Sequence, residues 1–408
     1  MIRDLASFSG KNVLLLQGPL GPFFMHLSRD LRNAGAKVTK VNFNGGDWLF
    51  SSGSCVNYTG HAIDWPKYLT RLIKERNIDV ILLFGDCRSL HRMALKLAVP
   101  MGIDVGVFEE GYLRPDYITF ERYGVNANSQ LPRDASHYLS VEPHIRPTQP
   151  VGNVFWFAAL WAIIYYSASS LLWPFFRRYQ HHRPLTVLEA WPWIKSGFRK
   201  LIYAQIEQDI QERLMNDYSK RFYLVPLQVH NDAQVHVHSP YKSVVDFIEN
   251  VIASFVKNAP HENLLVIKHH PMDRGYHDYT DAIRQLSIAY NAPDRVLYIH
   301  DQHLPTLLEH AAGVVLINST VGLSALHHGI PLKVCGDAIY DMPGLTFQGS
   351  LDDFWIGFRK FNLNISLYTS FISYLVGMTQ FNGSFYRKLP DTSNIAGIIW
   401  SDGLDKAA

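Results

Sequence analysis

The sequence predicts an α/β protein built from two doubly wound halves. A length of 408 residues exceeds what one hydrophobic core normally organises, so two domains are expected. Hydrophobic residues make up 47% of the chain and charged residues 18%, a composition typical of globular proteins. Short apolar runs alternate with helical periods in two separate stretches, which is the pattern of parallel sheets covered by helices.

The first alternation begins at Asn12 and the second near Arg221. The segments of the first are Val13–Leu16, Phe23–Ala34, Lys37–Phe43, Trp65–Arg76, Val80–Phe84, Ser89–Val99 and Asp104–Phe108. Those of the second are Phe222–Leu227, Val244–Val256, Leu264–Lys268, Asp281–Tyr290, Val296–Ile299, Leu304–Ala311, Val314–Ile317, Thr320–His328 and Pro331–Val334. The predicted parts are a first half (1–150), an apolar and basic helical segment (151–218), a second half (219–350) and a C-terminal helical region (351–408).

Bulk composition excludes one class of function and predicts a location. The formal net charge of +2 is too small for a nucleic-acid-binding domain, which carries a clear basic excess. Three scattered cysteines, Cys55, Cys87 and Cys335, fit a reducing compartment better than a disulfide framework. The amino-terminal stretch contains Asp4 and only a short apolar run, unlike a signal peptide. We therefore expect a cytoplasmic chain.

An apolar segment lies between the two halves. Residues 154–176 contain no charged side chain and nine aromatic ones. This length suits a transmembrane helix, but a single span would separate the halves and abolish a cleft between them. We expect instead an interfacial helix or hairpin that docks on the inner face of the cytoplasmic membrane beside basic residues, with a buried inter-domain helix pair as the alternative. The basic residues are Arg177, Arg178, Lys195, Arg199 and Lys200.

Polar residues follow two strands of the second half, where doubly wound sheets bind ligands. They are Lys268, His269, His270 and Pro271 after one strand, and Asn318, Ser319 and Thr320 after another. The first group brings a cation and two imidazoles, and the second begins a helix, whose free backbone N–H groups attract anions. If the strands are neighbours, the two groups together could hold a phosphate. The alternatives are an ordinary helix cap and a proline that only ends a strand.

Carboxylates follow strands in both halves. In the second half, the loop QVHND begins with Gln228 and ends with Asp232, a carboxylate among amides that is a candidate nucleophile or base. In the first half, Glu109 and Glu110 follow a strand, and adjacent carboxylates raise each other's pKa, which suits acid–base chemistry. The alternatives are a turn or cap aspartate and one catalytic glutamate beside a structural one.

A metal site is not expected, although the second half contains many histidines. Those considered are His230, His236, His238, His269, His270, His327 and His328. Their spacing lacks the helical HExxH arrangement, and the last two are adjacent and point apart on a helix.

Six motifs occur in order along the chain: GPFFMHLSRDL, VNFNGGDW, EEGYLRPDYITFE, PLQVHNDAQV, KHHP and NSTVGLSAL. Together they resemble the bacterial capsule polysaccharide synthesis and export family of β-Kdo transferases, most closely its KpsS/LipB type, over roughly residues 10–350. The resemblance implies a GT-B fold, CMP-Kdo as donor and a lysophosphatidylglycerol-type lipid as acceptor. The chain would place the first Kdo of a capsule linker on this lipid, in company with other capsule synthesis and export proteins. No metal or other cofactor is expected, because fixed cations and a helix amino terminus can stabilise the leaving phosphate.

Carried over by position, the resemblance assigns roles to individual residues. Asp232 matches the carboxylate nucleophile of a QxxxD motif that begins at Gln228, so retention of the β configuration would proceed through a glycosyl–enzyme adduct. Glu110, or else Glu109, would act as acid or base. We assign Lys268, His269, His270, Pro271, Asn318, Ser319 and Thr320 to the nucleotide side, and Gly18, Asn44, Asp47 and Arg114 to the acceptor side.

Two other functions fit the same architecture. A non-catalytic export or scaffold subunit would also use two α/β halves and a membrane-facing segment, but it would not need Asp232, His270 and Ser319 to converge. A GT-B-shaped nucleotide-sugar epimerase has no evident use for a membrane segment.

Overall fold

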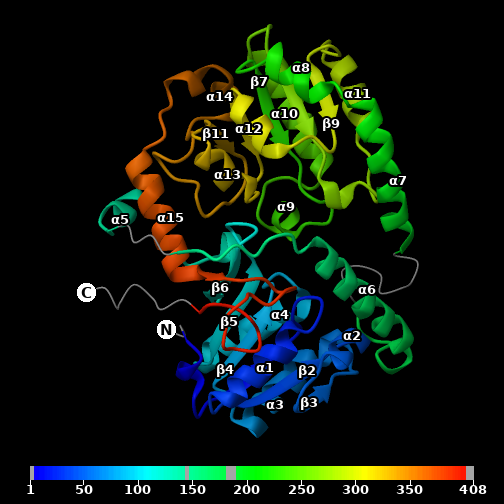
Figure 1. Ribbon diagram of the computed structural model, residues 1–408, viewed down its shortest axis with the longest axis vertical. Helices are drawn as coiled ribbons and strands as arrows, with labels where there is room; N and C mark the ends of the chain where they lie inside the picture. The colour runs from blue at the N-terminus through cyan, green and yellow to red at the C-terminus, as the bar shows by residue number, and fades with distance from the viewer. Residues whose placement is uncertain (1–3, 143–146, 181–189, 401–408) are drawn as a thin grey trace. The chain divides into compact units, whose positions relative to one another are not determined.

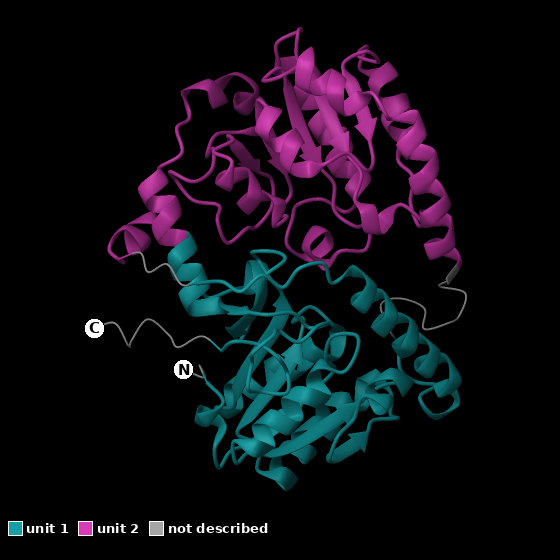
Figure 2. Cartoon of the chain, in the orientation of Figure 1, with its two compact units in different colours: residues 1–130, 143–189, 372–408 teal, residues 131–142, 190–371 magenta. Residues whose placement is uncertain are grey.

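The computed structural model describes residues 4–142, 147–180 and 190–400, whose helices and strands are labelled in Figure 1. The chain divides into two compact units, which Figure 2 shows in different colours. Unit 1 comprises residues 1–130, 143–189 and 372–408, and unit 2 comprises residues 131–142 and 190–371. The units are interleaved, whereas the predicted parts followed one another along the chain.

Unit 1 is built on a seven-stranded sheet with the order β12-β6-β5-β4-β1-β2-β3. The strands are β1 (Asn12–Leu15), β2 (Lys37–Asn42), β3 (Ser54–Asn57), β4 (Val80–Phe84), β5 (Asp104–Glu110), β6 (Tyr117–Arg122) and β12 (Gln380–Asn382). Strands β1 to β5 are parallel and have the order of a Rossmann sheet, while β6 and β12 add antiparallel strands at one edge. The carboxyl ends of β1 to β5 therefore meet at one edge of the sheet.

Strand β1 is buried on both faces. Because successive side chains of a strand point in opposite directions, its residues pack into two different cores. Leu14 packs into one core with residues of α3 (Trp65–Arg76) and α4 (Ser89–Ala98), whereas Val13 packs into another with residues of α1 (Phe23–Asn33). The doubly wound first half is thus confirmed.

The apolar segment 154–176 forms helix α6 (Phe155–Leu171), which packs against α2 (Gly45–Leu49) of the same unit. A Cβ at Gly45 would lie 2.3 Å from the carbonyl oxygen of Ala168, so the glycine allows the two backbones to approach closely. The opposite face of α6 is exposed, with Trp156 at 76%. No helix in the part of the chain that the structure describes is long and apolar enough to cross a membrane.

Unit 2 is built on a five-stranded parallel sheet with the order β11-β10-β7-β8-β9. The strands are β7 (Phe222–Pro226), β8 (Leu264–Lys268), β9 (Val296–Ile299), β10 (Gly313–Leu316) and β11 (Leu332–Val334). The helices are α5 (Ala135–Leu139), α7 (Ala190–Ile206), α8 (Ile210–Asn216), α9 (Ala233–Val237), α10 (Val244–Asn258), α11 (Thr280–Ala289), α12 (Leu304–His310), α13 (Val321–His327) and α14 (Leu351–Gly357). Helix α15 (Ile365–Thr379) begins in unit 2 and belongs to unit 1 from Ile372 on. This is again the Rossmann order, so both halves of the predicted GT-B-like architecture have the expected sheet.

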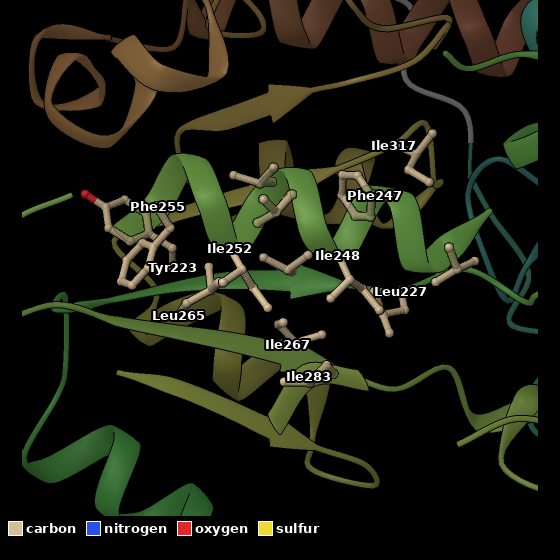
Figure 3. Close-up of a cluster of buried hydrophobic side chains, with 14 of the residues drawn as sticks. Tyr223, Leu227, Phe247, Ile248, Ile252, Phe255, Leu265, Ile267, Ile283 and Ile317 are labelled. Atoms are coloured by element: carbon tan, nitrogen blue, oxygen red, sulfur yellow. The ribbon is translucent and has the colours of Figure 1, made fainter. Parts of the chain in front are cut away.

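The core of unit 2 lies between its sheet and helix α10 (Figure 3). Phe247 and Ile248 of α10 pack with Leu227 at the end of β7, and Ile267 of β8 belongs to the same buried cluster. Each of these side chains is almost fully buried. This core fixes the carboxyl ends of β7 and β8, where the candidate site begins.

Candidate functional site

The strand order of unit 2 reverses between β7 and β10, and two predicted residues meet there. Gln228 follows β7 and Asn318 follows β10, and Gln228 Nε2 donates a hydrogen bond of 3.1 Å to Asn318 Oδ1. Both side chains are buried. In Rossmann sheets such a switch point forms the crevice that binds the ligand.

Asp232 lies at the same switch point, four residues after Gln228. Its Oδ2 accepts a hydrogen bond of 3.3 Å from Gln228 Nε2, and its Oδ1 accepts one of 2.9 Å from the backbone N–H of Gln234, which caps helix α9. Asn318 Nδ2 donates to the carbonyl oxygens of Gln234 and His238, at 3.0 and 3.1 Å. The partly buried carboxylate of Asp232 is therefore held by Gln228 and Gln234 of its own loop, and Asn318 contacts both of these residues.

Ser319 and Thr320 directly precede α13. Ser319 Oγ accepts a hydrogen bond of 3.3 Å from the backbone N–H of Val321, and its carbonyl oxygen accepts one from the hydroxyl of Tyr340. Thr320 is the N-cap residue, but its side chain makes no capping hydrogen bond. A capping function and a phosphate-binding function both fit this turn.

Strand β7 separates β8 from β10, so the strands that precede the two predicted phosphate-binding groups are not neighbours. Lys268, at the end of β8, donates from Nζ to the carbonyl oxygen of His300, 2.8 Å away and on the side of β9. Burial lowers the pKa of Lys268 below its usual value. The prediction that Lys268 and Ser319 hold one phosphate required their strands to be neighbours, which they are not. Lys268 instead stabilises the loop after β9.

The two histidines after β8 differ in their surroundings. His269 is buried, and its Nδ1 lies 2.6 Å from the hydroxyl of Tyr298, while Nε2 has no hydrogen-bond partner among the described residues. Burial lowers the pKa of His269 to about 4, so its ring is neutral at pH 7. His270 is partly exposed and accepts a hydrogen bond of 3.2 Å from the backbone N–H of Met272, and Pro271 begins the short helix η7 (Pro271–Asp273).

A pair that the sequence analysis missed ties the loop after β7 to the loop after β8. Nδ1 of His230 lies 2.5 Å from Oδ1 of Asp273, and the backbone N–H of His230 donates to Oδ2 at 3.0 Å. Asp273 is fully buried and also accepts a hydrogen bond of 3.2 Å from the hydroxyl of Tyr279. Asp273 lies in the sequence HHPMDRG, but only the strand order shows that its partner is His230.

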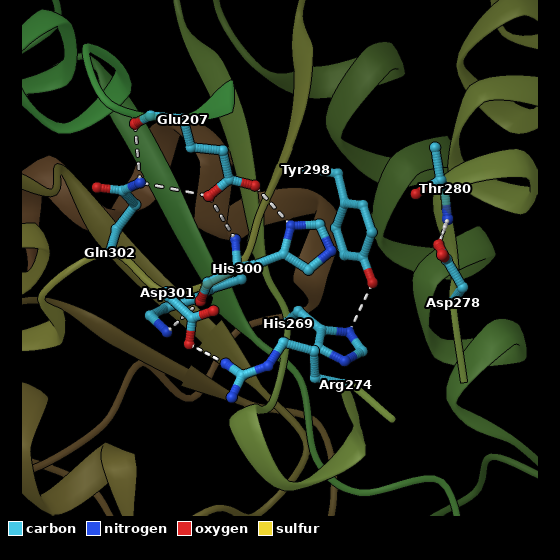
Figure 4. A network of polar contacts seen from close by, with 10 residues as sticks. Glu207, His269, Arg274, Asp278, Thr280, Tyr298, His300, Asp301 and Gln302 are labelled. Atoms are coloured by element: carbon cyan, nitrogen blue, oxygen red, sulfur yellow. Dashed lines mark hydrogen bonds and ion pairs between the residues drawn. The ribbon is translucent and has the colours of Figure 1, made fainter. Parts of the chain in front are cut away.

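A second missed network follows β9 (Figure 4). Oε1 of Glu207 lies 2.5 Å from Nδ1 of His300, and Oε2 accepts the backbone N–H of His300 at 3.0 Å. Burial acts to raise the pKa of Glu207, but the hydrogen bonds from His300 outweigh it, and the pKa is lowered. Arg274 forms an ion pair with Asp301 in the same network.

The sequence predicts that Glu109 and Glu110 follow a strand, whereas in the structure they are the last two residues of β5 and pair with Thr119 and Ile118 of β6. Burial raises the pKa of Glu109 to about 7, and the charge of Glu110 adds to the effect, although the backbone N–H of Glu110 donates to Glu109 Oε1 at 3.0 Å. Glu110 Oε1 accepts a hydrogen bond of 2.7 Å from the hydroxyl of Tyr386. A carboxyl with a pKa near 7 can act as either acid or base, and the choice between Glu110 and Glu109 for that role stays a prediction.

The predicted acceptor-side residues of unit 1 have structural contacts. Asp47 accepts hydrogen bonds from the Tyr165 hydroxyl at 2.8 Å and from Asn44 Nδ2 at 3.3 Å, and Asn44 Oδ1 accepts one from Ser169 at 3.1 Å. Asn44 and Asp47 are buried and attach α6 to α2 in this way. Burial raises the pKa of Asp47.

Gly18 and Arg114 lie in the two loops that follow β1 and β5. A Cβ at Gly18 would lie 2.7 Å from the ring of Phe24, and its carbonyl oxygen accepts a hydrogen bond of 3.4 Å from Arg88. Arg114 is exposed and donates from Nε to the carbonyl oxygen of Gly111 at 3.1 Å. Both positions support the loops, and their assignment to an acceptor site stays a prediction.

Comparisons with known proteins give consistent matches. The family model described as capsule polysaccharide biosynthesis protein matches residues 79–386. The capsule polysaccharide export protein KpsS of Escherichia coli is 42% identical over 390 residues, covering 93% of this chain and 97% of that protein. The capsule polysaccharide modification protein LipB of Neisseria meningitidis serogroup A is 38% identical over 391 residues, covering 93% of each. Among solved structures, the beta Kdo 2,7 transferase KpsC of Thermosulfurimonas dismutans aligns over 97% of both chains, with 15% identity and a TM-score of 0.46.

Proposed function

Because this chain belongs to the family of capsule polysaccharide biosynthesis proteins, we propose that it is a retaining glycosyltransferase that transfers Kdo from CMP-Kdo to a lysophosphatidylglycerol-type lipid. This transfer starts the linker of a capsular polysaccharide. The observation that supports the proposal most directly is the orientation of Asp232 by Gln228, which Asn318 contacts across the switch point of unit 2.

The proposed reaction has two displacements. Asp232 attacks the anomeric carbon of Kdo, and CMP leaves with the oxygen that joined it to the sugar. A hydroxyl of the lipid then attacks the same carbon, the bond to Asp232 breaks, and Glu109 or Glu110 takes the hydroxyl proton. Two inversions at one carbon retain the β configuration.

The nucleotide is held on unit 2 in this proposal, without a metal. In the proposal, His270 beside Pro271 after β8, and Ser319 and Thr320 after β10, contact its phosphate from the two sides of β7, because imidazole, hydroxyl and backbone N–H groups stabilise an anion. Lys268 and His269 are buried and support that edge of the sheet.

The protein acts at a surface in this proposal, because its acceptor is a lipid. The exposed aromatic face of α6, with Trp156, docks on the inner face of the cytoplasmic membrane together with Trp173 of the short helix η5 (Trp173–Phe175) that follows. Other capsule synthesis and export proteins are the expected partners.

Incubation of the purified protein with a CMP-Kdo-generating system and lysophosphatidylglycerol tests the proposal. Mass spectrometry of the lipid should show one or more added Kdo residues, and Asp232→Asn should abolish the product. Release of CMP without a lipid product contradicts the proposed acceptor. An isomerised sugar nucleotide indicates an epimerase, and no change in either substrate indicates a scaffold subunit.

A further inference from the structure

Helix α7 of unit 2 directs polar side chains toward the loops that follow β8 and β9. Arg199 donates from Nη1 to the carbonyl oxygen of Arg274 at 2.8 Å and forms an ion pair of 3.0 Å with Asp278. In the reverse direction, Arg274 donates from Nε to the carbonyl oxygen of Ser196 at 3.0 Å. These contacts join α7 to residues 274–278, directly after the predicted nucleotide-side residues His270 and Pro271.

The same face of α7 continues to the loop after β9. The ring of Tyr203 stacks on His300 with 3.5 Å between ring centroids and 9° between planes. Glu207, one residue beyond the helix, binds His300 and accepts a hydrogen bond of 3.0 Å at its carbonyl oxygen from Gln302. Contact residues spaced three or four apart lie on one side of a helix, so the polar side of α7 is its inward side.

The contact is close at the level of the backbone. A Cβ at Gly275 would lie 2.0 Å from the carbonyl oxygen of Pro192, in the first turn of α7. No side chain fits between these backbones without moving one of them. A shift of α7 therefore shifts the loop that contains Gly275.

The outward side of α7 is apolar and basic. Trp191, Phe198 and Leu201 are 67%, 66% and 70% exposed. Helix α7 contains no acidic residue, and apart from Arg199 on the inward side its basic residues are Lys195 and Lys200. Aromatic and aliphatic side chains flanked by lysines within the helix are the pattern of a helix that lies on an anionic lipid surface.

We propose that the outward side of α7 binds an anionic membrane surface and that this binding orders the loop 270–278 of the nucleotide side. Lipid contact at α7 thus prepares the site in unit 2 where the donor nucleotide binds. The effect of lipid contact on donor binding rests on the proposed function. The lipid contact itself and the response of the loop are properties of unit 2 that can be measured without turnover.

Vesicle flotation of the full chain tests the lipid contact. The protein should float with vesicles that contain phosphatidylglycerol and much less with vesicles of phosphatidylcholine alone. Phe198→Ser combined with Leu201→Ser should lower the partition coefficient about tenfold or more, because two large apolar side chains are lost. Ile288→Ser combined with Ile356→Ser, exposed apolar positions elsewhere in unit 2, should leave it unchanged.

A charge variant gives a second, independent measurement of the same contact. Lys195→Glu combined with Lys200→Glu should weaken binding to phosphatidylglycerol vesicles and leave any binding to phosphatidylcholine as it was. Thermal unfolding followed by circular dichroism shows that each variant is folded. Equal flotation of wild type and both α7 variants would overturn the proposal.

Hydrogen exchange tests the response of the loop. Phosphatidylglycerol vesicles should slow exchange in a peptide that covers residues 270–280. Asp278→Asn removes the ion-pair partner of Arg199 but leaves the outward side of α7 intact, so this variant should still float and should lose most of the protection. Unchanged exchange in the wild type on binding would overturn the proposal.

The alternative binding partner for the outward side of α7 is a second copy of this chain. Concentration-dependent self-association that Phe198→Ser with Leu201→Ser abolishes, without flotation of the wild type, would contradict the lipid proposal. Neither flotation nor exchange uses CMP-Kdo, so absence of glycosyl transfer would count against the proposed function alone.

Discussion

Gln228 and Asn318 are 90 residues apart in the sequence and are joined by a hydrogen bond of 3.1 Å where the strand order of unit 2 reverses. Gln228 also contacts Asp232, so one amide links the carboxylate to the neighbouring strand. A buried side-chain bond of this kind fixes orientation, because leaving either amide unpaired costs free energy.

Asp232→Asn should reduce glycosyl transfer by several orders of magnitude, because the variant lacks the attacking carboxylate. Asparagine is also a good N-cap residue, so α9 should remain intact. Binding of CMP, measured by calorimetry, should be within about threefold of wild type because the proposed phosphate contacts lie elsewhere. Asp281→Asn, at an exposed carboxylate, is the matched control. Near-normal transfer by Asp232→Asn would exclude it as nucleophile.

A double-mutant cycle on Gln228→Ala and Asn318→Ala should reveal coupling between the two residues. Each single variant removes one hydrogen bond from a buried amide and should lower the free energy of unfolding by about 1–3 kcal/mol. The double variant should lose less than the sum of the two, by about 1 kcal/mol. Urea unfolding measures all four proteins. Strict additivity would show that the hydrogen bond contributes nothing in solution.

The sequence predicted most strands and helices of both halves because their apolar runs are regular, as in Val80–Phe84, but it did not predict β3 or β6. It also missed β12, because the three residues Gln380–Asn382 show no apolar run and form a strand only by pairing with β6. It identified Gln228, Asp232 and Asn318 as residues beyond strand ends but could not show that Gln228 contacts the other two. Such contacts depend on strand order, which no local pattern contains.

Glu109→Gln should change the pH dependence of stability. The pKa of Glu109 is raised to about 7 in the folded chain, above its usual 4.5, so its ionised form opposes folding. Below pH 4.5 the carboxyl is protonated in both states, and the variant should match wild type. Above pH 7 the variant should be more stable, by at most about 3 kcal/mol. Urea unfolding at pH 4.5 and 8 checks this, with exposed Glu249→Gln as a control that shows no such trend.

Tyr165→Phe should loosen α6 from unit 1. The hydroxyl of Tyr165 donates to the buried carboxylate of Asp47 at 2.8 Å, and Asn44 donates to that hydroxyl at 2.9 Å. Its loss should lower the free energy of unfolding by about 1–3 kcal/mol. Limited proteolysis should then cut within 155–171 before other sites. Tyr290→Phe, at an exposed tyrosine, should have no comparable effect.

The tryptophans of the apolar segment should behave in two ways. Trp156→Ser and Trp173→Ser remove exposed aromatic groups and should lower recovery with membranes without changing the melting temperature. Trp161→Ser should lower the melting temperature instead, because its indole N–H donates to the carbonyl oxygen of Tyr386 at 3.1 Å and its ring packs on Phe50. Membrane fractionation and thermal melts distinguish the two results, and equal melting temperatures for all three would contradict the division.

Strand β12 has a consequence for the order of events during synthesis. Unit 2 ends at residue 371, whereas the core of unit 1 also needs Phe381, Phe385 and Ile398. A ribosome therefore exposes every residue of unit 2 before it delivers the strand that covers the edge of β6. Until then the nascent first half presents an unpaired strand edge, and that edge is where aggregation or chaperone capture would begin.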